Sequence, residues 1–188
     1  MTEAEVFQLL TDTGAIQDGH FILSSGLHSG RYFQCAQVLQ YPEHTERLCK
    51  ELAHRLAGIE AELVAGPAFG GIIVAYELAR QLGIRSIFAE RQDRRMTFRR
   101  GFAVAPGARA IIAEDVITTG GSVLEVAAAL RSLGAQVLCV AALLDRSAGV
   151  DLGVRLEALA HATAENYAPE SCPLCARQVA LSKPGSRA

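Results

Sequence analysis

Residues 111–122 read Ile111-Ile112-Ala113-Glu114-Asp115-Val116-Ile117-Thr118-Thr119-Gly120-Gly121-Ser122. An apolar run comes first, two acids follow it, and hydroxyls and glycines then lead into a helical pattern that extends to residue 133. Strands that are covered on both faces are apolar at successive positions, as this run is. The segment therefore predicts a strand, a turn and a helix, with the acids at the edge of a sheet where ligands of open α/β proteins bind.

The chain after Gly58 alternates between apolar runs and helical patterns. The runs lie at 62–65, 86–89, 110–113 and 137–144, and the helical patterns at 71–82 and 121–133. Such alternation predicts an α/β fold, in which helices flank both faces of a parallel sheet. The 188 residues are expected to form a single domain, with no linker that would divide it.

Residues 1–40 are expected to form an N-terminal helix and a small hood. Thr2 and Glu5 have the spacing of a capping box, which predicts that a helix begins there. Two short β-like runs, 21–23 and 32–33, are separated by a Ser/Gly-rich link and predict a hairpin. A further helix is predicted between Pro42 and Gly58, and residues 183–188 form a loose tail.

Composition excludes several classes of protein. The net charge of −2 and the pI near 6.2 give no general attraction to nucleic acid, and no apolar stretch approaches the roughly 20 residues of a membrane-spanning helix. The N-terminal residues are acidic, unlike those of a secretory signal. Five cysteines, an odd number, favour reduced thiols. We therefore expect a cytoplasmic protein that binds neither nucleic acid nor membrane.

The residue types in 114–122 suit a phosphorylated sugar. Glycines allow the backbone to approach an anion closely, and the free N–H groups at a helix start point toward it. Adjacent carboxylates can accept hydrogen bonds from two neighbouring ribose hydroxyls, and Thr and Ser side chains supply further donors. The alternative is an acidic turn before an ordinary Thr-capped helix, but the position of the acid pair directly after an apolar strand favours the sugar phosphate.

The segment 111–122 resembles the phosphoribosyl pyrophosphate (PRPP) motif of type I phosphoribosyltransferases. Three further segments resemble the orotate-specific members of that family. They are Phe21-Ile22-Leu23-Ser24-Ser25-Gly26-Leu27-His28-Ser29, Gly66-Pro67-Ala68-Phe69-Gly70-Gly71 and Leu144-Asp145-Arg146-Ser147. The resemblance implies a pentosyltransferase of pyrimidine (UMP) biosynthesis, in which orotate N1 displaces pyrophosphate from PRPP with inversion and gives orotidine 5′-phosphate. It also implies Mg²⁺ that is bound mainly through PRPP or pyrophosphate, with no metal site on the chain itself.

The same resemblance implies the site residues. Glu114 and Asp115 would hold the ribose hydroxyls, and the turn after them would hold the 5′-phosphate. The residues expected to bind PRPP are Gly70, Gly71, Arg91, Glu114, Asp115, Val116, Ile117, Thr118, Thr119, Gly120, Gly121 and Ser122. Those expected to bind orotate are Ser25, Phe33, Thr118 and Arg146. A guanidinium can form two parallel hydrogen bonds with a carboxylate, so Arg146 suits the carboxylate of orotate. The alternative for Arg146 is a surface salt bridge. The alternative for Phe33 is simple hydrophobic packing.

Two segments depart from the family pattern. In the turn 66–71, many relatives have a lysine at the position of Gly70, so main-chain groups would hold pyrophosphate here; a turn without a ligand is the alternative. Relatives also often have a lysine at Ser24. Between Glu90 and Gly101, relatives have a mobile loop with lysines and a histidine, whereas this chain has five arginines.

We expect the loop 91–101 to complete the neighbouring active site of a homodimer. Arg91 and Arg100, together with Asp115, are the expected catalytic residues, because permanent positive charge neutralises the departing pyrophosphate. A solvated run of charge is the alternative for this loop.

Cys172 and Cys175 have metal-ligand spacing, but no second pair or neighbouring histidine in the sequence completes a four-ligand site. The five histidines share no spacing, and none is given a role. Two other functions compete with orotate transfer: a nucleic-acid-binding regulator that only senses PRPP, and the same transfer to a purine base. The sequence has no helix-turn-helix segment for the first, and a purine has no carboxylate for Arg146 in the second.

Overall fold

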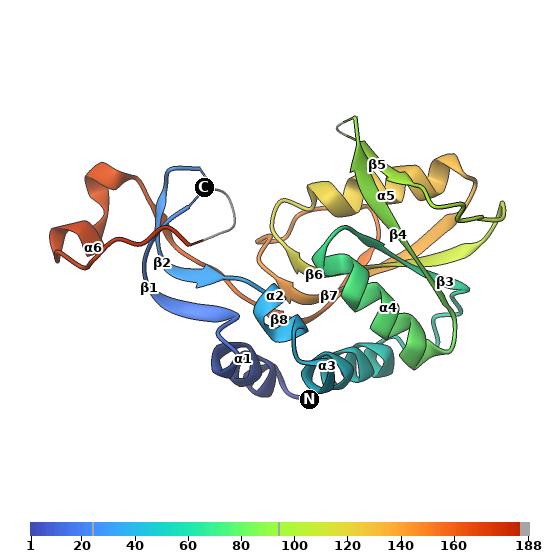
Figure 1. Cartoon of the computed structure of the whole chain (residues 1–188), viewed down its shortest axis with the longest axis horizontal. Helices are drawn as coiled ribbons and strands as arrows, with labels where there is room; N and C mark the ends of the chain where they lie inside the picture. The colour runs from blue at the N-terminus through green and yellow to red at the C-terminus, as the bar shows by residue number, and fades with distance from the viewer. Residues whose placement is uncertain (24, 94, 185–188) are drawn as a thin grey trace.

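The computed structural model describes residues 1–23, 25–93 and 95–184, which form a six-stranded sheet and a separate three-stranded sheet (Figure 1). The strands are β1 (Ile16–Ile22), β2 (His28–Phe33), β3 (Leu63–Pro67), β4 (Arg85–Gln92), β5 (Arg95–Phe98), β6 (Arg109–Ile117), β7 (Gln136–Asp145), β8 (Arg155–His161) and β9 (Asn166–Tyr167). The helices are α1 (Glu3–Asp12), α2 (Ala36–Leu39), α3 (Pro42–Arg55), α4 (Gly70–Leu82), α5 (Gly121–Ser132) and α6 (Pro173–Ala176), with a 3₁₀ turn, η1 (Pro169–Ser171).

The six-stranded sheet has the strand order β5-β4-β3-β6-β7-β8. Strand β5 is antiparallel to β4, and the other neighbours are parallel. The four apolar runs of the sequence lie in β3, β4, β6 and β7, and both predicted helical patterns form helices. The α/β fold predicted from their alternation is therefore confirmed.

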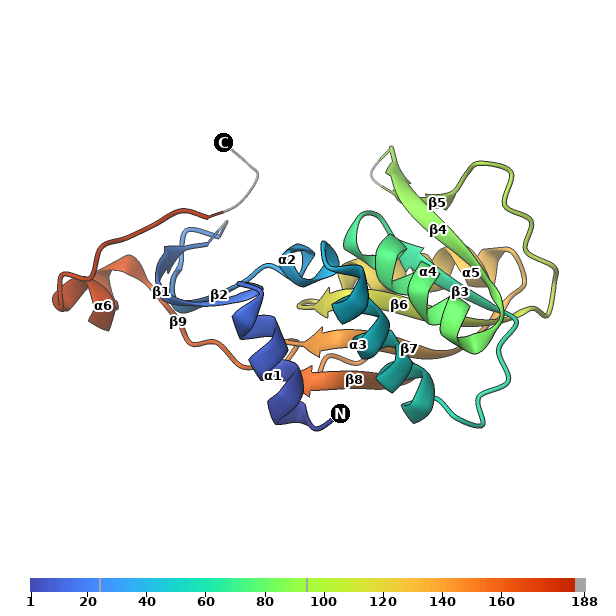
Figure 2. The same cartoon turned by 60° about the horizontal axis from the view of Figure 1, so that its bottom comes forward.

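Helices cover both faces of this sheet, and the side chains of β6 alternate between them. Ile111 belongs to an apolar cluster with residues of α1, α3 and α4, whereas the next residue, Ile112, belongs to a cluster with residues of α5. In Figure 1, α5 lies above the large sheet and α3 and α4 lie below it, and Figure 2 shows α3 and α4 in front of the strands. Among the described residues, no helix combines the length and the apolar character that crossing a membrane requires.

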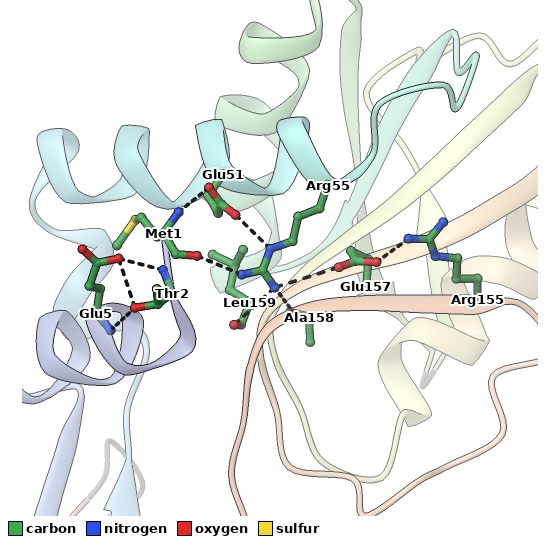
Figure 3. A network of polar contacts seen from close by, with 9 residues as sticks. All are labelled: Met1, Thr2, Glu5, Glu51, Arg55, Arg155, Glu157, Ala158 and Leu159. Atoms are coloured by element: carbon green, nitrogen blue, oxygen red, sulfur yellow. Dashed lines mark hydrogen bonds and ion pairs between the residues drawn. The ribbon is translucent and has the colours of Figure 1, made fainter.

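The N-terminal helix begins at the predicted capping box. The Glu5 N–H donates to the Thr2 hydroxyl at 3.3 Å, and the Thr2 N–H donates to the Glu5 carboxylate at 2.7 Å. Figure 3 shows how the adjoining residues fix this helix to the sheet. The Arg55 guanidinium on α3 donates to the carbonyls of Met1 at 3.3 Å and of Ala158 at 3.0 Å. Arg55 therefore joins the start of α1 to the edge strand β8.

The three-stranded sheet forms a hood at one end of the molecule. The predicted hairpin is confirmed, because β1 pairs antiparallel with β2. The last part of the chain returns to this hairpin: Tyr167 on β9 pairs with His28, and Ser182 forms a bridge with Phe21. Figure 1 shows α6 beside the same small sheet. We define the hood as residues 16–35 and 163–184, with Ser24 outside the described residues.

The arginine-rich segment forms a β-hairpin, and the prediction of a loop over 91–101 is corrected accordingly. Strand β4 extends to Gln92, and Arg91 pairs with Met96 on β5. The pairing satisfies backbone groups that β4 would otherwise leave exposed at the sheet edge. Arg94 lies outside the described residues, and residues 99–101 form a turn after β5.

Candidate active site

The two acids of the motif lie near the carboxyl end of β6, in the middle of the large sheet. Only 8% of Glu114 is exposed, and Asp115 is half-buried. The Asp115 N–H donates to Glu114 Oε1 at 3.1 Å, and the Val116 N–H donates to Asp115 Oδ1 at 2.8 Å. Each carboxylate has about four lone-pair directions, so main-chain donors orient both groups and leave acceptor capacity for a ligand.

The turn that follows β3 lies against this acid pair. A Cβ atom at Gly70 would lie 2.2 Å from Asp115 Oδ2, and one at Gly71 would lie 2.9 Å from Glu114 Oε1. A side chain at position 70 would therefore meet the Asp115 carboxylate, which would have to move. The structure thus brings together two segments, 66–71 and 114–115, that the sequence predicted separately.

Burial raises the pKa of both carboxyl groups. For Glu114, burial is the largest cause and the nearby Asp115 charge is the second, and together they raise the pKa to about 9. Burial also raises the pKa of Asp115, although hydrogen bonds from the Glu114 side chain and the Val116 backbone oppose this shift. Two negative charges in one buried site are unfavourable, so a ligand that donates hydrogen bonds to both is stabilised there.

We expect a Glu114→Gln variant to gain stability over the wild type as the pH rises. The folded pKa of Glu114, about 9, lies above the unfolded value of about 4.3. The stabilising contribution of Glu114 is therefore fully present below the unfolded pKa and is lost as the pH rises through the folded pKa. The test compares the melting temperatures of the two ligand-free proteins between about pH 5 and pH 9. A difference of 1 kcal/mol in the free energy of unfolding corresponds to about 2–4 °C in melting temperature. A difference that stays constant with pH would contradict the raised pKa, and Asp12→Asn on exposed α1 is the control.

The predicted phosphate-binding turn joins β6 to α5. Gly120 has φ 73° and ψ 0°, in the left-handed region that glycine tolerates best. Gly120 has no side chain to cap α5, and of the first N–H groups of this helix, that of Gly121 donates to the Thr119 hydroxyl at 3.4 Å. The N–H groups that follow it at the helix start can point toward an anion. A small cavity of about 50 Å³ is formed here. Its lining residues are Glu114, Val116, Ile117, Thr118, Thr119, Gly120, Gly121, Ser122 and Val123.

Arg146 follows β7 and lies beside the end of β6, because its N–H donates to the Ile117 carbonyl at 2.8 Å. Its guanidinium carbon lies 3.9 Å from the centroid of the Phe33 ring. Burial lowers the pKa of Arg146, and its buried Nε donor has no hydrogen-bond partner among the described residues. In a surface salt bridge, the Nε donor would be exposed to solvent or paired with a carboxylate. Here it is buried and has no described partner, which favours an anion as its partner.

Of the three other residues predicted to bind orotate, Thr118 lines the small cavity, and Phe33 and Ser25 have different surroundings. Phe33 is 8% exposed, belongs to an apolar cluster and has the Arg146 guanidinium against its ring. The ring therefore positions Arg146 through a cation–π contact, while its stacking on the base stays a prediction. Ser25 is exposed and accepts a hydrogen bond from the Leu27 N–H at 3.4 Å. Ser24, where relatives often have a lysine, lies outside the described residues.

Both predicted loop cations form ion pairs within the chain. Arg91 donates to the two Glu125 carboxylate oxygens at 3.0 Å each, and Arg100 donates to the two Glu90 oxygens at 2.8 and 3.0 Å. The arginine side chains are 48% and 62% exposed. Their described contacts are with these glutamates and not with the acid pair, so a role in the reaction stays a prediction.

Asp145, which precedes Arg146, was quoted in the sequence motif but given no role. The Ser147 N–H donates to Asp145 Oδ1 at 2.8 Å, and the His161 Nδ1 lies 3.1 Å from Oδ2. Burial raises the pKa of Asp145, but hydrogen bonds from Ser147 and His161 outweigh it and hold the pKa below its usual value. Asp145 therefore fixes the turn that carries Arg146, and its position at the end of an apolar strand is the signal that pointed to it.

A larger cavity, about 510 Å³, lies between β5 and α5. Its lining residues are Arg95, Met96, Thr97, Phe98, Glu125, Ala128, Ala129, Ser132 and Leu133. It contains neither the acid pair nor the turn 118–122. The larger cavity therefore lies apart from the predicted site, which is identified by its charged and donor groups and not by cavity volume.

Comparisons with known proteins agree with this geometry. The family model for the phosphoribosyl transferase domain matches residues 36–153. The orotate phosphoribosyltransferase of Pelotomaculum thermopropionicum is 56% identical over all of this chain and 99% of its own length. The orotate phosphoribosyltransferase of Caldanaerobacter subterraneus is 47% identical over all of this chain and 99% of its own length.

Solved structures show the same architecture. Orotate phosphoribosyltransferase from Aeropyrum pernix is 29% identical with a TM-score of 0.67, over 82% of this chain and 92% of that chain. The Mycobacterium tuberculosis enzyme, at 21% identity and a TM-score of 0.71 over 85% and 95% of the chains, supports the fold alone. The family model matches more than half of the chain, and the curated relatives are similar over their full length. The chain therefore belongs to the orotate phosphoribosyltransferase family.

Proposed function

We propose that this chain transfers the 5-phosphoribosyl group of PRPP to N1 of orotate, which yields orotidine 5′-phosphate and pyrophosphate for UMP biosynthesis. The observation that carries the proposal is the position of the acid pair: Asp115 lies against the glycine turn at Gly70, and Glu114 lines the same small cavity as the helix start at 120–122. It occurs in a chain that is 47–56% identical to curated orotate phosphoribosyltransferases over their full length.

The residues have complementary roles in this proposal. Glu114 and Asp115 accept hydrogen bonds from the two ribose hydroxyls, and the amides and hydroxyls of 118–122 hold the 5′-phosphate. The backbone of Gly70 and Gly71 faces the pyrophosphate. Arg146 donates to the orotate carboxylate, and Thr118 lies between the base and the sugar phosphate. With the ribose held at both ends, N1 attacks the anomeric carbon as the bond to the pyrophosphate oxygen breaks.

Mg²⁺ enters this reaction on PRPP. Carboxylate oxygens together with substrate phosphates are the ligands that this ion accepts, so the acid pair is compatible with its presence beside the ribose. The ion supplies neutralisation of the pyrophosphate charge, while the protein supplies orientation of the two reactants. The proposal includes a cytoplasmic location, which suits the five free cysteines of the described chain.

The direct test is an assay with purified protein, Mg²⁺, PRPP and orotate, in which ultraviolet absorbance follows the conversion of the base. We expect conversion that requires all four components. Adenine and hypoxanthine serve as controls, because neither has a carboxylate for Arg146. Transfer to a purine but not to orotate would refute the proposal, as would PRPP binding without transfer to any base.

The hairpin arginines are part of the proposal. We expect Arg91→Ala and Arg100→Ala each to lower turnover and to leave the melting temperature almost unchanged, since both side chains are exposed. Arg85→Gln, at the other end of β4 and also exposed, is the matched control. Wild-type turnover in both variants would contradict a role for these residues.

We also propose a homodimer in which the hairpin 91–101 completes the neighbouring site. Mixing two impaired variants, Asp115→Asn and Arg100→Ala, tests this arrangement. If the hairpin acts on the other subunit, each heterodimer regains one intact site, and roughly one quarter of wild-type activity returns after random exchange of subunits. No recovery in demonstrated heterodimers would place the hairpin at the site of its own subunit.

A further inference from the structure

Four potential metal ligands meet inside the hood. His20 on β1 and His28 on β2 lie beside Cys172 and Cys175, which flank the start of α6. One donor atom from each residue lies within 4.8 Å of all the others. In the sequence, no second cysteine pair or nearby histidine completes the Cys172–Cys175 pair, and only two copies meeting across a dimer could supply the missing ligands. The fold corrects this, because two histidines that are remote in sequence are adjacent in space.

The distances between these donor atoms match a tetrahedral zinc centre. The His20 Nε2 lies 3.0 Å from His28 Nδ1 and 3.4 Å from Cys172 Sγ. The Cys175 Sγ lies 3.3 Å from His28 Nδ1 and 3.8 Å from His20 Nε2. With Zn–N of about 2.0–2.1 Å and Zn–S of about 2.3 Å, tetrahedral geometry separates two nitrogens by about 3.3 Å and a nitrogen from a sulfur by about 3.6 Å.

A second contact fixes His20 in the orientation that a ligand needs. Its Nδ1 lies 2.8 Å from the Val179 carbonyl oxygen, which can only accept a hydrogen bond. The proton therefore resides on Nδ1, and Nε2 presents a lone pair to the two sulfurs and to His28. Histidines that bind metals usually donate their other ring nitrogen to such an acceptor. Val179 belongs to the same C-terminal segment that supplies both cysteines.

Among the described residues, the hood forms no apolar cluster of its own, because its buried Ile16, Phe33 and Cys35 belong to the cluster that also contains residues of α1, α3 and α4. His20, His28 and Cys172 are only 2%, 5% and 3% exposed, and none of the three belongs to either apolar cluster of the large sheet. Small units that cannot bury enough apolar surface are commonly stabilised by a metal or a disulfide. All five cysteines are free thiols, so a metal is the agent that fits this position.

We propose that His20, His28, Cys172 and Cys175 bind one structural zinc ion that joins the C-terminal segment to the β1–β2 hairpin. Four protein ligands of the Cys₂His₂ type make a closed site, with no open position for a substrate. The ion would stand in for an apolar core in the hood and would hold the β1–β2 hairpin, which ends at the predicted orotate-binding residue Phe33. This site is separate from the Mg²⁺ that enters with PRPP.

The test is the metal content of the full-length protein, produced with zinc in the medium and purified with a thiol reductant. We expect about one zinc per chain by elemental analysis. Replacement by Co²⁺ should give the intense visible bands of a tetrahedral ion and a thiolate charge-transfer band. Zinc, but not Mg²⁺, should restore the melting temperature after a chelator has lowered it, because binding to the folded state alone is stabilising.

Two variants at the site and two controls make the test specific. Cys175→Ser is the gentler change, since Cys175 is exposed, and His28→Asn removes a ligand from the hairpin. Each should reduce bound zinc at least about tenfold. The controls are Cys139→Ala in β7 and His54→Asn at an exposed position of α3, which should keep the full zinc content.

Folded, reduced wild-type protein that carries neither zinc nor cobalt would overturn the proposal and would leave a hydrogen-bonded cluster in its place. Undiminished zinc in both site variants would also overturn it, as would a Cys172–Cys175 disulfide in protein produced with zinc. Orotate transfer is measured separately on the same preparations, so a failure of the zinc site remains distinct from a failure of the proposed function.

Discussion

Asp115→Asn is expected to lower kcat/KM by about 10²–10³, the range for removal of one pre-organised group that stabilises charge or orients the substrate. The reason is the proposed role of Asp115, which lies against Gly70 near the end of β6: its carboxylate would accept a hydrogen bond from a ribose hydroxyl and restrict rotation of the sugar. Glu114→Gln should have an effect of the same kind. Steady-state kinetics with varied PRPP measures both variants.

The same substitutions should not unfold the protein, which separates this prediction from a structural effect. Burial raises the pKa of both carboxyl groups, so their ionised forms cost stability in the ligand-free protein. The amide variants should therefore melt at or above the wild-type temperature while they lose activity, as groups kept for function often do. Asp12→Asn on α1 is the control. Wild-type kinetics in both site variants would contradict the assignment, and so would a large fall in their melting temperatures.

Arg146→Ala is expected to lower kcat/KM for orotate by about 10²–10⁴ and to leave PRPP binding within about a factor of 3. Hydrogen bonds to a charged group contribute about 1.5–3 kcal/mol each, and a guanidinium makes two with a carboxylate. Arg146→Lys should recover only part of the loss, because an ammonium lacks the planar fork. Varied-orotate kinetics measures the first effect, and calorimetric titration with PRPP measures the second.

Arg131→Lys, an exposed residue of α5, is the control for this series. The Nε of Arg146 has no hydrogen-bond partner among the described residues. An unchanged KM for orotate in Arg146→Ala would show that this donor serves a ligand other than orotate. Equal losses of orotate use and PRPP binding would indicate that the β7 turn as a whole had moved. Phe33→Leu adds a further check, since removal of the ring under the guanidinium should weaken orotate use in the same direction.

The large sheet was predictable because local sequence and burial agree in it. The run 110–113 is apolar at every position, as a strand covered on both faces must be, and the acids after it end up at the carboxyl edge. The Thr2 and Glu5 cap and Pro42 also mark helix starts through local chemistry. The contact between Gly70 and Asp115 could be expected in outline, since both turns follow neighbouring parallel strands.

Features that depend on distant parts of the chain were not predictable. Strand β8 has exposed Arg155 and His161 at its ends, as edge strands do, and gave no continuous apolar run. The hairpin at β5 depends on pairing with β4, whereas its five arginines resemble a solvated loop in the sequence. The ligand cluster of the hood joins His20 to Cys172 across 152 positions. Spacing rules detect only ligands that are close in sequence.

Calorimetric titration of PRPP, with Mg²⁺, into the wild-type protein and into Asp115→Asn tests the central assignment most directly. The account predicts saturable binding of one PRPP per chain in the wild type, weakened at least about tenfold in the variant, or by about 1.4 kcal/mol. Equal affinity in the two proteins, or no binding of PRPP to the folded wild type, would contradict the claim that the acid pair and the turn 118–122 form the site for the activated ribose.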